Sequence, residues 1–297
     1  MKPAPFKFTA PDSVSEVLAL IRQHGDEAKL LAGGQSLIPL LNFRLASPGL
    51  LVDLNRIEEL DFIHKSPEGG LRIGAMTRQS RLERHPLVAE RAPLLGETMP
   101  FVAHPQIRSR GTLGGTLAHA DPAAELPAVA VTLGARFRLQ SDTGERWLTA
   151  QDFFVGLLTT ALTPEEMLVE IDIPPTPPGW GGSFMEIARR HGDYALAGLA
   201  VGVTLDPAGK CSEARLVYLS AGDGPLVAHE AAAILTGERP TDDLIEAVAR
   251  QAAEAEVEPT SDIHASAEFK RHLCGVLTRR ALTTAIHRAT GDTWDKS

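Results

Sequence analysis

The chain has 297 residues, of which 43% are hydrophobic and 23% charged, an ordinary globular composition for about two domains. Its net charge of -9 argues against nucleic acid as a partner, because phosphates require a basic face. Two cysteines are too few for an iron–sulfur cluster, and this low content, with no apolar stretch of about 18 residues, predicts a cytoplasmic protein without membrane insertion.

The first part of the chain alternates helix and strand patterns. Ser13 and Glu16 have the spacing of a capping box, and apolar residues then recur at helical spacing until Gly25. Apolar runs over residues 29–32 and 50–54 predict strands, with a helix over 37–45 between them. We therefore expect a small α/β subdomain over about residues 1–58.

The next part is richer in strands. We expect them over residues 71–76, 135–140, 145–148 and 168–173, with residues 141–144 as the turn of a hairpin. The segment 174–182 contains four prolines and three glycines, which exclude both helix and central strand. We place a domain boundary at about residue 178, so that residues 1–178 form one domain with subdomains over about 1–58 and 59–178.

Beyond this boundary the patterns predict a second, smaller domain over residues 179–297. Strands are expected over 199–205 and 214–220, followed by helices near 226–235, 244–255 and 269–286. This order is typical of a small α+β domain.

Two glycine loops carry the first chemical signal. Residues 32–36 (AGGQS) directly follow a predicted strand, and residues 111–116 (GTLGGT) repeat the pattern of paired glycines flanked by hydroxyls. Such turns can point successive N–H groups at an anion such as a pyrophosphate, although a glycine-rich turn without a ligand fits equally well. Neither loop matches a Rossmann fingerprint or a P-loop. Two loops about eighty residues apart favour one long ligand, such as a dinucleotide, held between two lobes.

Three motifs in order resemble a known family. Residues 32–37 (AGGQSL), 112–115 (TLGG) and 192–195 (GDYA) are similar to the FAD-binding medium subunit of the carbon monoxide dehydrogenase and xanthine dehydrogenase (molybdenum hydroxylase) family. The resemblance covers essentially the whole chain. It implies an α+β protein: a PCMH-type (vanillyl-alcohol-oxidase-like) FAD-binding domain of two α/β subdomains, then a carbon monoxide dehydrogenase flavoprotein-like domain with an antiparallel sheet and helices.

The resemblance also implies which residues bind the cofactor. The two loops would hold the FAD pyrophosphate and neighbouring groups, and Val102 and Leu168 would line the cofactor. Glu125 would accept hydrogen bonds from FAD hydroxyls, and Tyr194 would pack against the isoalloxazine ring. The residues implied are Leu30, Leu31, Ala32, Gly33, Gly34, Gln35, Ser36, Leu37, Val102, Thr112, Leu113, Gly114, Gly115, Glu125, Leu168, Glu186 and Tyr194. From the residues alone, Glu125 also fits a surface carboxylate, and Tyr194 a core aromatic.

Glu186 is a departure from the family pattern. It stands where xanthine dehydrogenases have a lysine near the flavin pyrimidine edge. A carboxylate there would accept a hydrogen bond from flavin N3–H but would not stabilise negative charge near N1. The departure puts direct reaction with NAD in doubt.

No catalytic residue and no metal site are expected on this chain. His104, His119, Asp121 and Glu125 match no usual zinc or di-iron spacing, and Ser36 lacks the context of a nucleophile. The arginines at 108, 110, 189 and 190 are expected on a solvated face, although they could also face phosphates or a partner subunit.

The resemblance implies an electron-transfer function. In this family, electrons leave the substrate at a molybdopterin centre and pass through iron–sulfur clusters to FAD and then to an external acceptor. Because this chain lacks cluster cysteines, we expect a large molybdopterin-binding subunit and a small 2Fe–2S subunit as partners, in a dimer of heterotrimers. Two alternatives stay open: a stand-alone flavin-dependent oxidoreductase, such as a MurB-like reductase or an oxidase, and a non-redox assembly subunit.

Overall fold

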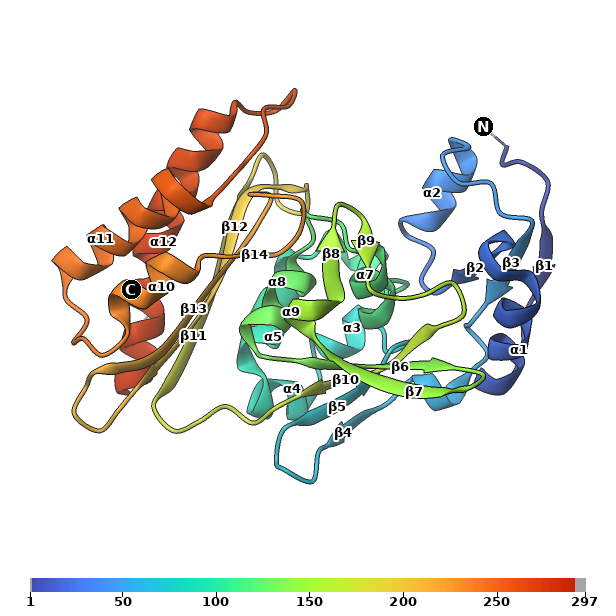
Figure 1. Cartoon of the computed structure of the whole chain (residues 1–297), viewed down its shortest axis with the longest axis horizontal. Coiled ribbons are helices and arrows are strands. Elements are labelled where there is room, and N and C mark those ends of the chain that lie inside the picture. Colours follow the sequence, from blue (N-terminus) through green and yellow to red (C-terminus); the bar gives the residue numbers. More distant parts are fainter. Residues whose placement is uncertain (1, 292–297) are drawn as a thin grey trace.

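The computed structural model describes residues 2–291, and its three parts lie side by side along the long axis (Figure 1). The N-terminal part is a parallel sheet of order β1–β3–β2. Its elements are β1 (Lys7–Thr9), α1 (Val14–His24), β2 (Ala28–Leu31), α2 (Leu37–Asn42) and β3 (Leu50–Asp53). The predicted strand–turn–helix–strand beginning is therefore confirmed.

The start of α1 follows the predicted cap with one change. The Ser13 hydroxyl accepts a hydrogen bond from the Glu16 N–H at 3.3 Å, as an N-cap should. The Glu16 carboxylate, however, accepts from the Asp12 N–H at 3.1 Å, one residue before the position that a capping box uses.

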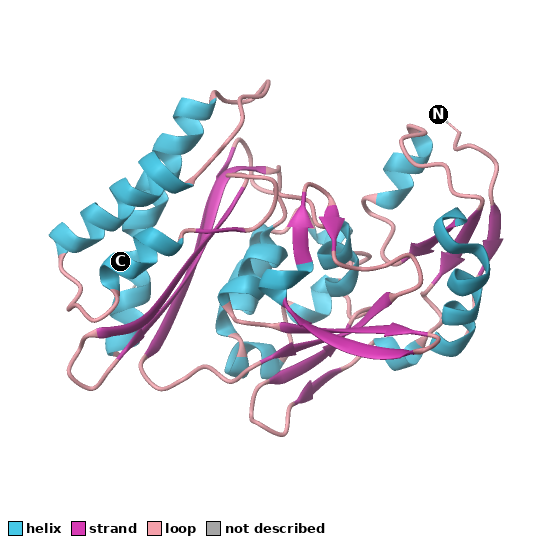
Figure 2. Ribbon diagram, viewed as in Figure 1, coloured by secondary structure: helices cyan, strands magenta, loops and turns pink. Residues whose placement is uncertain are grey.

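The middle part is a five-stranded antiparallel sheet of order β4–β5–β10–β6–β7, with short helices over one face (Figure 2). Its strands are β4 (Ile63–Lys65), β5 (Leu71–Gly74), β6 (Arg136–Ser141), β7 (Gly144–Thr149) and β10 (Met167–Ile173), and a separate hairpin consists of β8 (Phe154–Gly156) and β9 (Thr159–Thr160). Its helices are α3 (Gln79–Leu82), α4 (Pro86–Arg91), α5 (Pro93–Thr98), α6 (Pro105–Arg108), α7 (Leu113–His119), α8 (Glu125–Thr132) and α9 (Ala150–Phe153). The predicted hairpin turn over residues 141–144 is confirmed, since Ser141 pairs with Gly144.

The C-terminal part is a four-stranded antiparallel sheet of order β11–β12–β13–β14, and helices cover its outer face (Figure 2). Its strands are β11 (Trp180–Ala188), β12 (Ala195–Leu205), β13 (Cys211–Leu219) and β14 (Leu226–Val227), and its helices are α10 (His229–Leu235), α11 (Asp242–Gln251) and α12 (Ala267–Thr290).

Two elements differ from expectation here. Strand β11 begins at Trp180, inside the segment from which we had excluded a helix and a central strand; it lies at the edge of its sheet, where neighbouring prolines are tolerated. Its glycines serve close packing: a Cβ on Gly181 would lie 2.0 Å from the Ala285 carbonyl oxygen of α12. The helix expected from residue 226 begins at His229, because Leu226 and Val227 pair with β13.

The C-terminal sheet packs on both faces. Along β11, Phe184 belongs to the core of the middle part, whereas Met185 and Ile187 pack into the core beneath α10–α12. On β13, Leu219 lies on the inner side and Tyr218 on the outer side. This period of two, typical of a strand, makes the sheet a wall shared by two cores.

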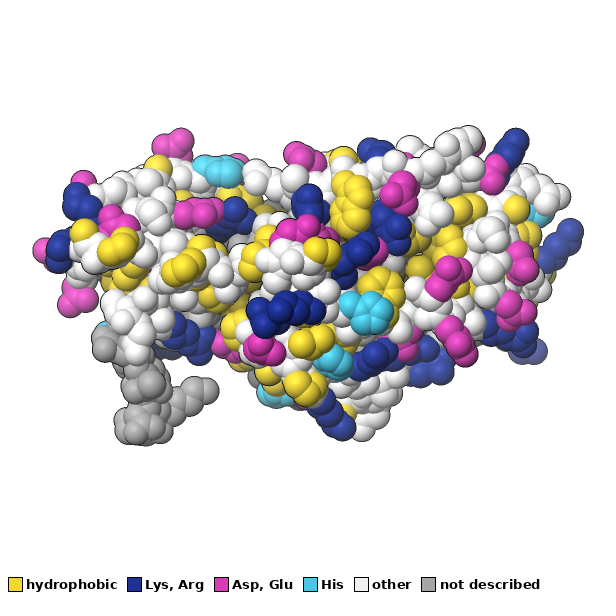
Figure 3. All heavy atoms as spheres, turned by 90° about the horizontal axis from the view of Figure 1, so that it is seen from below, with side chains coloured by type: hydrophobic (Ala, Val, Ile, Leu, Met, Phe, Trp, Pro, Cys, Tyr) yellow, Lys and Arg dark blue, Asp and Glu magenta, His cyan; other side chains and the backbone are white. Residues whose placement is uncertain are grey.

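Basic and acidic side chains are interspersed over the face that Figure 3 shows. Among the described residues, no helix has the length and apolar character needed to cross a membrane.

Candidate functional site

The first glycine loop has free backbone donors. It follows β2, and Gly34 at its centre has φ +76°, which favours glycine. Within residues 2–291 the N–H groups of residues 33–36 meet no protein acceptor, while the Gly33 carbonyl accepts from the Gln35 side chain at 3.0 Å. Consecutive free N–H groups in one turn are the geometry that binds an anion.

The backbone N–H groups of the second glycine loop already donate to acceptors within the protein. Three N–H groups at the start of α7, those of residues 113–115, bond to the Thr77 carbonyl (3.0 Å), the Ala75 carbonyl (2.8 Å) and the Thr112 hydroxyl (3.1 Å). A Cβ on Gly114 would lie 2.5 Å from that of Ala75. We expected both loops to form anion nests; this one instead anchors α7 against the end of β5.

The two loops touch each other. A Cβ on Gly33 would lie 2.5 Å from the Arg110 carbonyl oxygen and 2.8 Å from the Gly111 Cα, and one on Gly115 would lie 3.2 Å from the Ala32 Cβ. The lack of side chains at these positions lets the backbones meet. The loops therefore form one continuous wall, as the hypothesis of a single long ligand requires.

Two residues that the sequence analysis missed connect the loops. Asn55 donates to the Ala32 carbonyl at 3.0 Å, and Arg78 donates both to Asn55 and to the Arg110 carbonyl. Desolvation lowers the pKa of Arg78, and the charge of Arg110 lowers it further. Asn55 could have been found from its place just after β3, because ligands bind at the carboxyl ends of parallel strands.

Glu125 and Glu186 come together from different domains. Glu125 begins α8 and is 7% exposed, and Glu186 lies on the inner side of β11, where its Oε2 atom is buried without a partner. Burial raises the pKa of Glu125 to about 7, with a smaller effect of the Asp121 charge. Burial and then the Glu125 charge raise the pKa of Glu186 to about 8. Glu125 is thus a buried carboxyl, and its interpretation as a surface carboxylate is wrong.

Tyr194 lies near Glu125 and is open to solvent. Its side chain is 70% exposed, so the interpretation as a core aromatic is also wrong. Partial desolvation raises the pKa of its hydroxyl, and the charges of Asp121 and Glu125 add to this effect. Tyr194 is therefore an aromatic side chain that is exposed to solvent near Glu125 and Asp121.

The turn that contains Val102 packs against the loop before Tyr194. Val102 is 6% exposed, and its carbonyl accepts a hydrogen bond from Arg108 at 3.0 Å. Arg108, which we expected on a solvated face, is 5% exposed and forms an ion pair with Glu83 at 3.0 Å. A Cβ on Gly192 would lie 2.4 Å from the His104 ring, so the loop before Tyr194 packs on this turn.

Leu168 is a buried candidate that belongs to the core. It is 6% exposed within the core of the middle part. The next residue of β10, Val169, accepts from the Ala75 N–H at 3.0 Å, and the Ala75 carbonyl accepts from Gly114. Leu168 is therefore joined to the second loop through β5.

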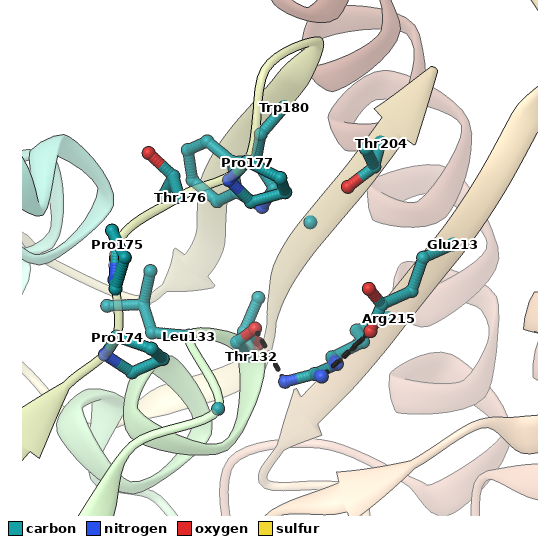
Figure 4. Close-up of a pocket in the computed structure, with 12 residues that line it drawn as sticks. Thr132, Leu133, Pro174, Pro175, Thr176, Pro177, Trp180, Thr204, Glu213 and Arg215 are labelled. Atoms are coloured by element: carbon teal, nitrogen blue, oxygen red, sulfur yellow. Dashed lines mark hydrogen bonds and ion pairs between the residues drawn. The ribbon is translucent and has the colours of Figure 1, made fainter. Parts of the chain in front are cut away.

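A separate pocket lies at the seam between the domains. Figure 4 shows Pro174–Pro177, Trp180 and Arg215 around it, and none of the predicted cofactor-binding residues lines it. Arg215 points toward Glu213, with which it forms an ion pair at 2.7 Å.

Comparison with protein families assigns both halves of the chain. Residues 4–176 match the FAD binding domain in molybdopterin dehydrogenase, and residues 182–285 match the CO dehydrogenase flavoprotein C-terminal domain. The resemblance inferred from the three motifs is therefore confirmed.

Similar proteins match over almost their full length. The 6-hydroxypseudooxynicotine dehydrogenase complex subunit alpha of Paenarthrobacter nicotinovorans is 43% identical, covering 97% of each chain. The carbon monoxide dehydrogenase medium chain of Hydrogenophaga pseudoflava is 38% identical and covers 97% of this chain and 99% of its own. A solved structure of carbon monoxide dehydrogenase from that organism matches with a TM-score of 0.93 at 38% identity, over 97% of this chain and 99% of the other. The chain thus belongs to the family of FAD-binding flavoprotein subunits of molybdopterin dehydrogenases.

Proposed function

We propose that this chain binds FAD between its two glycine loops and its C-terminal domain, and transfers electrons from a partner's iron–sulfur clusters to an external acceptor. The open row of N–H groups in the first loop carries the assignment of the site. FAD has a pyrophosphate that such a row can bind, and its flavin exchanges electrons singly or in pairs.

The remaining residues fit the other groups of FAD. The buried carboxyl of Glu125 suits hydroxyl donors, the unpartnered Oε2 of Glu186 suits a ring N–H, and the exposed ring of Tyr194 suits a planar face. The second loop supplies an anchored wall, and its Leu113 shares one core with Val102 and Leu168. In this proposal the chain's residues position the cofactor and exclude water, and none of them is catalytic.

The clusters belong to partner subunits in this proposal. Cys211 and Cys274 are both buried, and burial raises the pKa of their thiols to about 11 and about 12, which disfavours the thiolates that iron requires. We propose a large molybdopterin subunit and a small iron–sulfur subunit as partners, in a cytoplasmic dimer of heterotrimers. Purification of the native assembly tests this: two further chains with iron and molybdenum support it, and an isolated, fully active flavoprotein contradicts it.

A charge placed in the first loop tests the cofactor site. The Ser36 side chain makes no capping hydrogen bond in the structure, and aspartate is itself a good residue before a helix. We expect Ser36→Asp to leave the fold intact and to weaken FAD binding by at least about tenfold, because its carboxylate repels the pyrophosphate.

Ser36→Asn is the matched control, since it has the same shape without the charge. Flavin absorbance after dialysis and a fluorescence titration with FAD measure the difference between the variants. Equal FAD affinity of the two would contradict the placement of the pyrophosphate.

A further inference from the structure

The buried Glu125 and the half-buried Glu186 lie together without a cation. Glu186 shares the inner side of β11 with Phe184, which belongs to the core of the middle part, and its Cβ lies against Gly198 of β12. Glu125 reaches the same region from the first turn of α8: the carbonyl of Pro122, just before this helix, accepts from the Ser220 N–H at 2.8 Å, at the end of β13 whose Leu219 pairs with Gly198. Among the described residues, no lysine or arginine forms an ion pair with either carboxyl, and no other residue donates a hydrogen bond to Glu186 Oε2.

The surrounding groups do not supply positive charge either. Asp121 adds negative charge beside Glu125, and the charges of both carboxyls add to the desolvation that raises the pKa of the Tyr194 hydroxyl. Glu97 of α5, which packs on β11, is already paired with Arg288 of α12 at 2.5 Å. Two ionised carboxylates in such a place repel each other and lack solvation, so one of them is expected to hold a proton.

We propose that Glu125 and Glu186 form a proton-binding pair that holds one proton at neutral pH and takes up a second from solvent when negative charge arrives on the bound ligand. The second half of this inference rests on the proposed function, because it is the flavin ring that would bring the charge. Each uptake is a simple protonation of a carboxylate, Glu⁻ + H⁺ → GluH, while the electrons come from the partner's clusters or, in the test, from dithionite. The pair thereby compensates the added charge at a site where this chain has no lysine.

Burial and pKa values agree with this proposal. Burial raises the pKa of Glu125 to about 7, and burial with the Glu125 charge raises the pKa of Glu186 to about 8. Both folded values lie above the ordinary carboxyl value of 4.5. These two carboxyls therefore bind protons more tightly in the folded chain than in the unfolded chain, and the stability that they contribute falls as pH rises from about 4.5 through about 8.

Infrared spectroscopy of the purified full-length chain tests the pair directly. A protonated carboxyl has a carbonyl stretch that an ionised carboxylate lacks, so a pH titration from 6 to 9 follows the proton. We expect the wild-type band to be present at neutral pH and to disappear in alkaline solution. In Glu125→Gln the band of Glu186 should disappear at lower pH, and in the double Glu125→Gln, Glu186→Gln variant it should be absent.

Glu58→Gln is the control, because Glu58 is exposed and should leave the band unchanged. Thermal denaturation at each pH gives a second reading: the loss of stability toward alkaline pH should be smaller in Glu186→Gln than in wild type. Absence of a protonated carboxyl in the wild type at neutral pH, or an unchanged titration in Glu125→Gln, overturns the pair.

The flavin gives a third reading. With FAD bound, the midpoint potential of the wild type should change with pH more steeply than that of Glu186→Gln between pH 7 and 9. Equal slopes would contradict the uptake of a second proton on reduction, but would not contradict a pair that holds one proton at neutral pH. FAD content is measured in the same samples, so a wild-type chain that binds no FAD overturns the proposed function, whereas the infrared band still decides on the pair.

Discussion

At the scale of single residues, the glycines of the site serve different purposes. Gly34 has a backbone conformation that other residues rarely adopt, whereas Gly33 and Gly115 allow the two loops to touch. The sequence predicted flexible glycines next to a ligand. It did not predict that two of them would be required for contact between the loops, because that contact joins positions about eighty residues apart.

Gly33→Ala tests the contact between the loops. The added methyl group would lie 2.5 Å from a backbone carbonyl of the second loop, so one loop must move. We expect a loss of about 1–3 kcal/mol in the free energy of unfolding, together with weaker FAD binding. Chemical denaturation measures the first and flavin fluorescence the second.

Gly224→Ala is the control, because its new methyl group would meet no atom within 4 Å. Gly33→Ala protein with wild-type stability and FAD affinity would contradict the close contact.

At the scale of elements, one ion pair stabilises the start of the long helix α12. Lys270 of α12 is 7% exposed in its side chain and bonds to Asp262, which is 41% exposed and also accepts from the N–H groups of His264 and Ala265. The Lys270 ammonium, with smaller contributions from those N–H groups, lowers the pKa of Asp262 to about 2. The stability that Asp262 contributes is therefore present above its unfolded pKa of about 4 and is lost as pH falls through about 2.

Asp262→Asn should lower the free energy of unfolding by roughly 1–3 kcal/mol, less than the loss at a fully buried pair because Asp262 is partly exposed. The asparagine keeps an acceptor for the loop but leaves the Lys270 charge uncompensated. Urea denaturation at neutral pH measures the loss. The double variant Asp262→Asn, Lys270→Met should recover part of it, and no recovery would contradict an electrostatic origin.

At the scale of the whole molecule, the core of the middle part extends across the boundary between the two domains. Phe184 of β11 is 2% exposed, and its ring lies 5.3 Å from that of Phe101 in the FAD-binding part. Its N–H also donates to Glu97 of α5 at 3.4 Å. A core that crosses from one domain to the other predicts that both unfold in a single transition.

Phe184→Ala should cost about 3–5 kcal/mol, because it opens a cavity in this shared core. Differential scanning calorimetry should give one transition in the wild type and one transition at lower temperature in the variant. Phe269→Ala, at a side chain that is 49% exposed, is the control with little expected effect. Two separate wild-type transitions would show that the domains are independent.

The sequence by itself determined the local elements and the glycine turn after β2. Strands such as β6 and β10 and the long helix α12 were predictable, because their apolar residues recur with the period of the element. Strand β11 was not, since a glycine such as Gly181 is explained only by its close packing against α12. The motifs were enough to indicate the family. Because both loops share the same glycine pattern, however, the sequence predicted an anion-binding turn in each of them.

Only the tertiary structure decided which groups remain free at the site. Folding consumes the N–H groups of the second loop and leaves those of the first one open. It also brings Glu186 from β11 to Glu125 of α8, sixty-one positions away in the chain, and it buries Glu125 and the Oε2 atom of Glu186. Hydrogen-bond partners, burial and charge neighbours are properties of positions in space, and a sequence pattern records only positions along the chain.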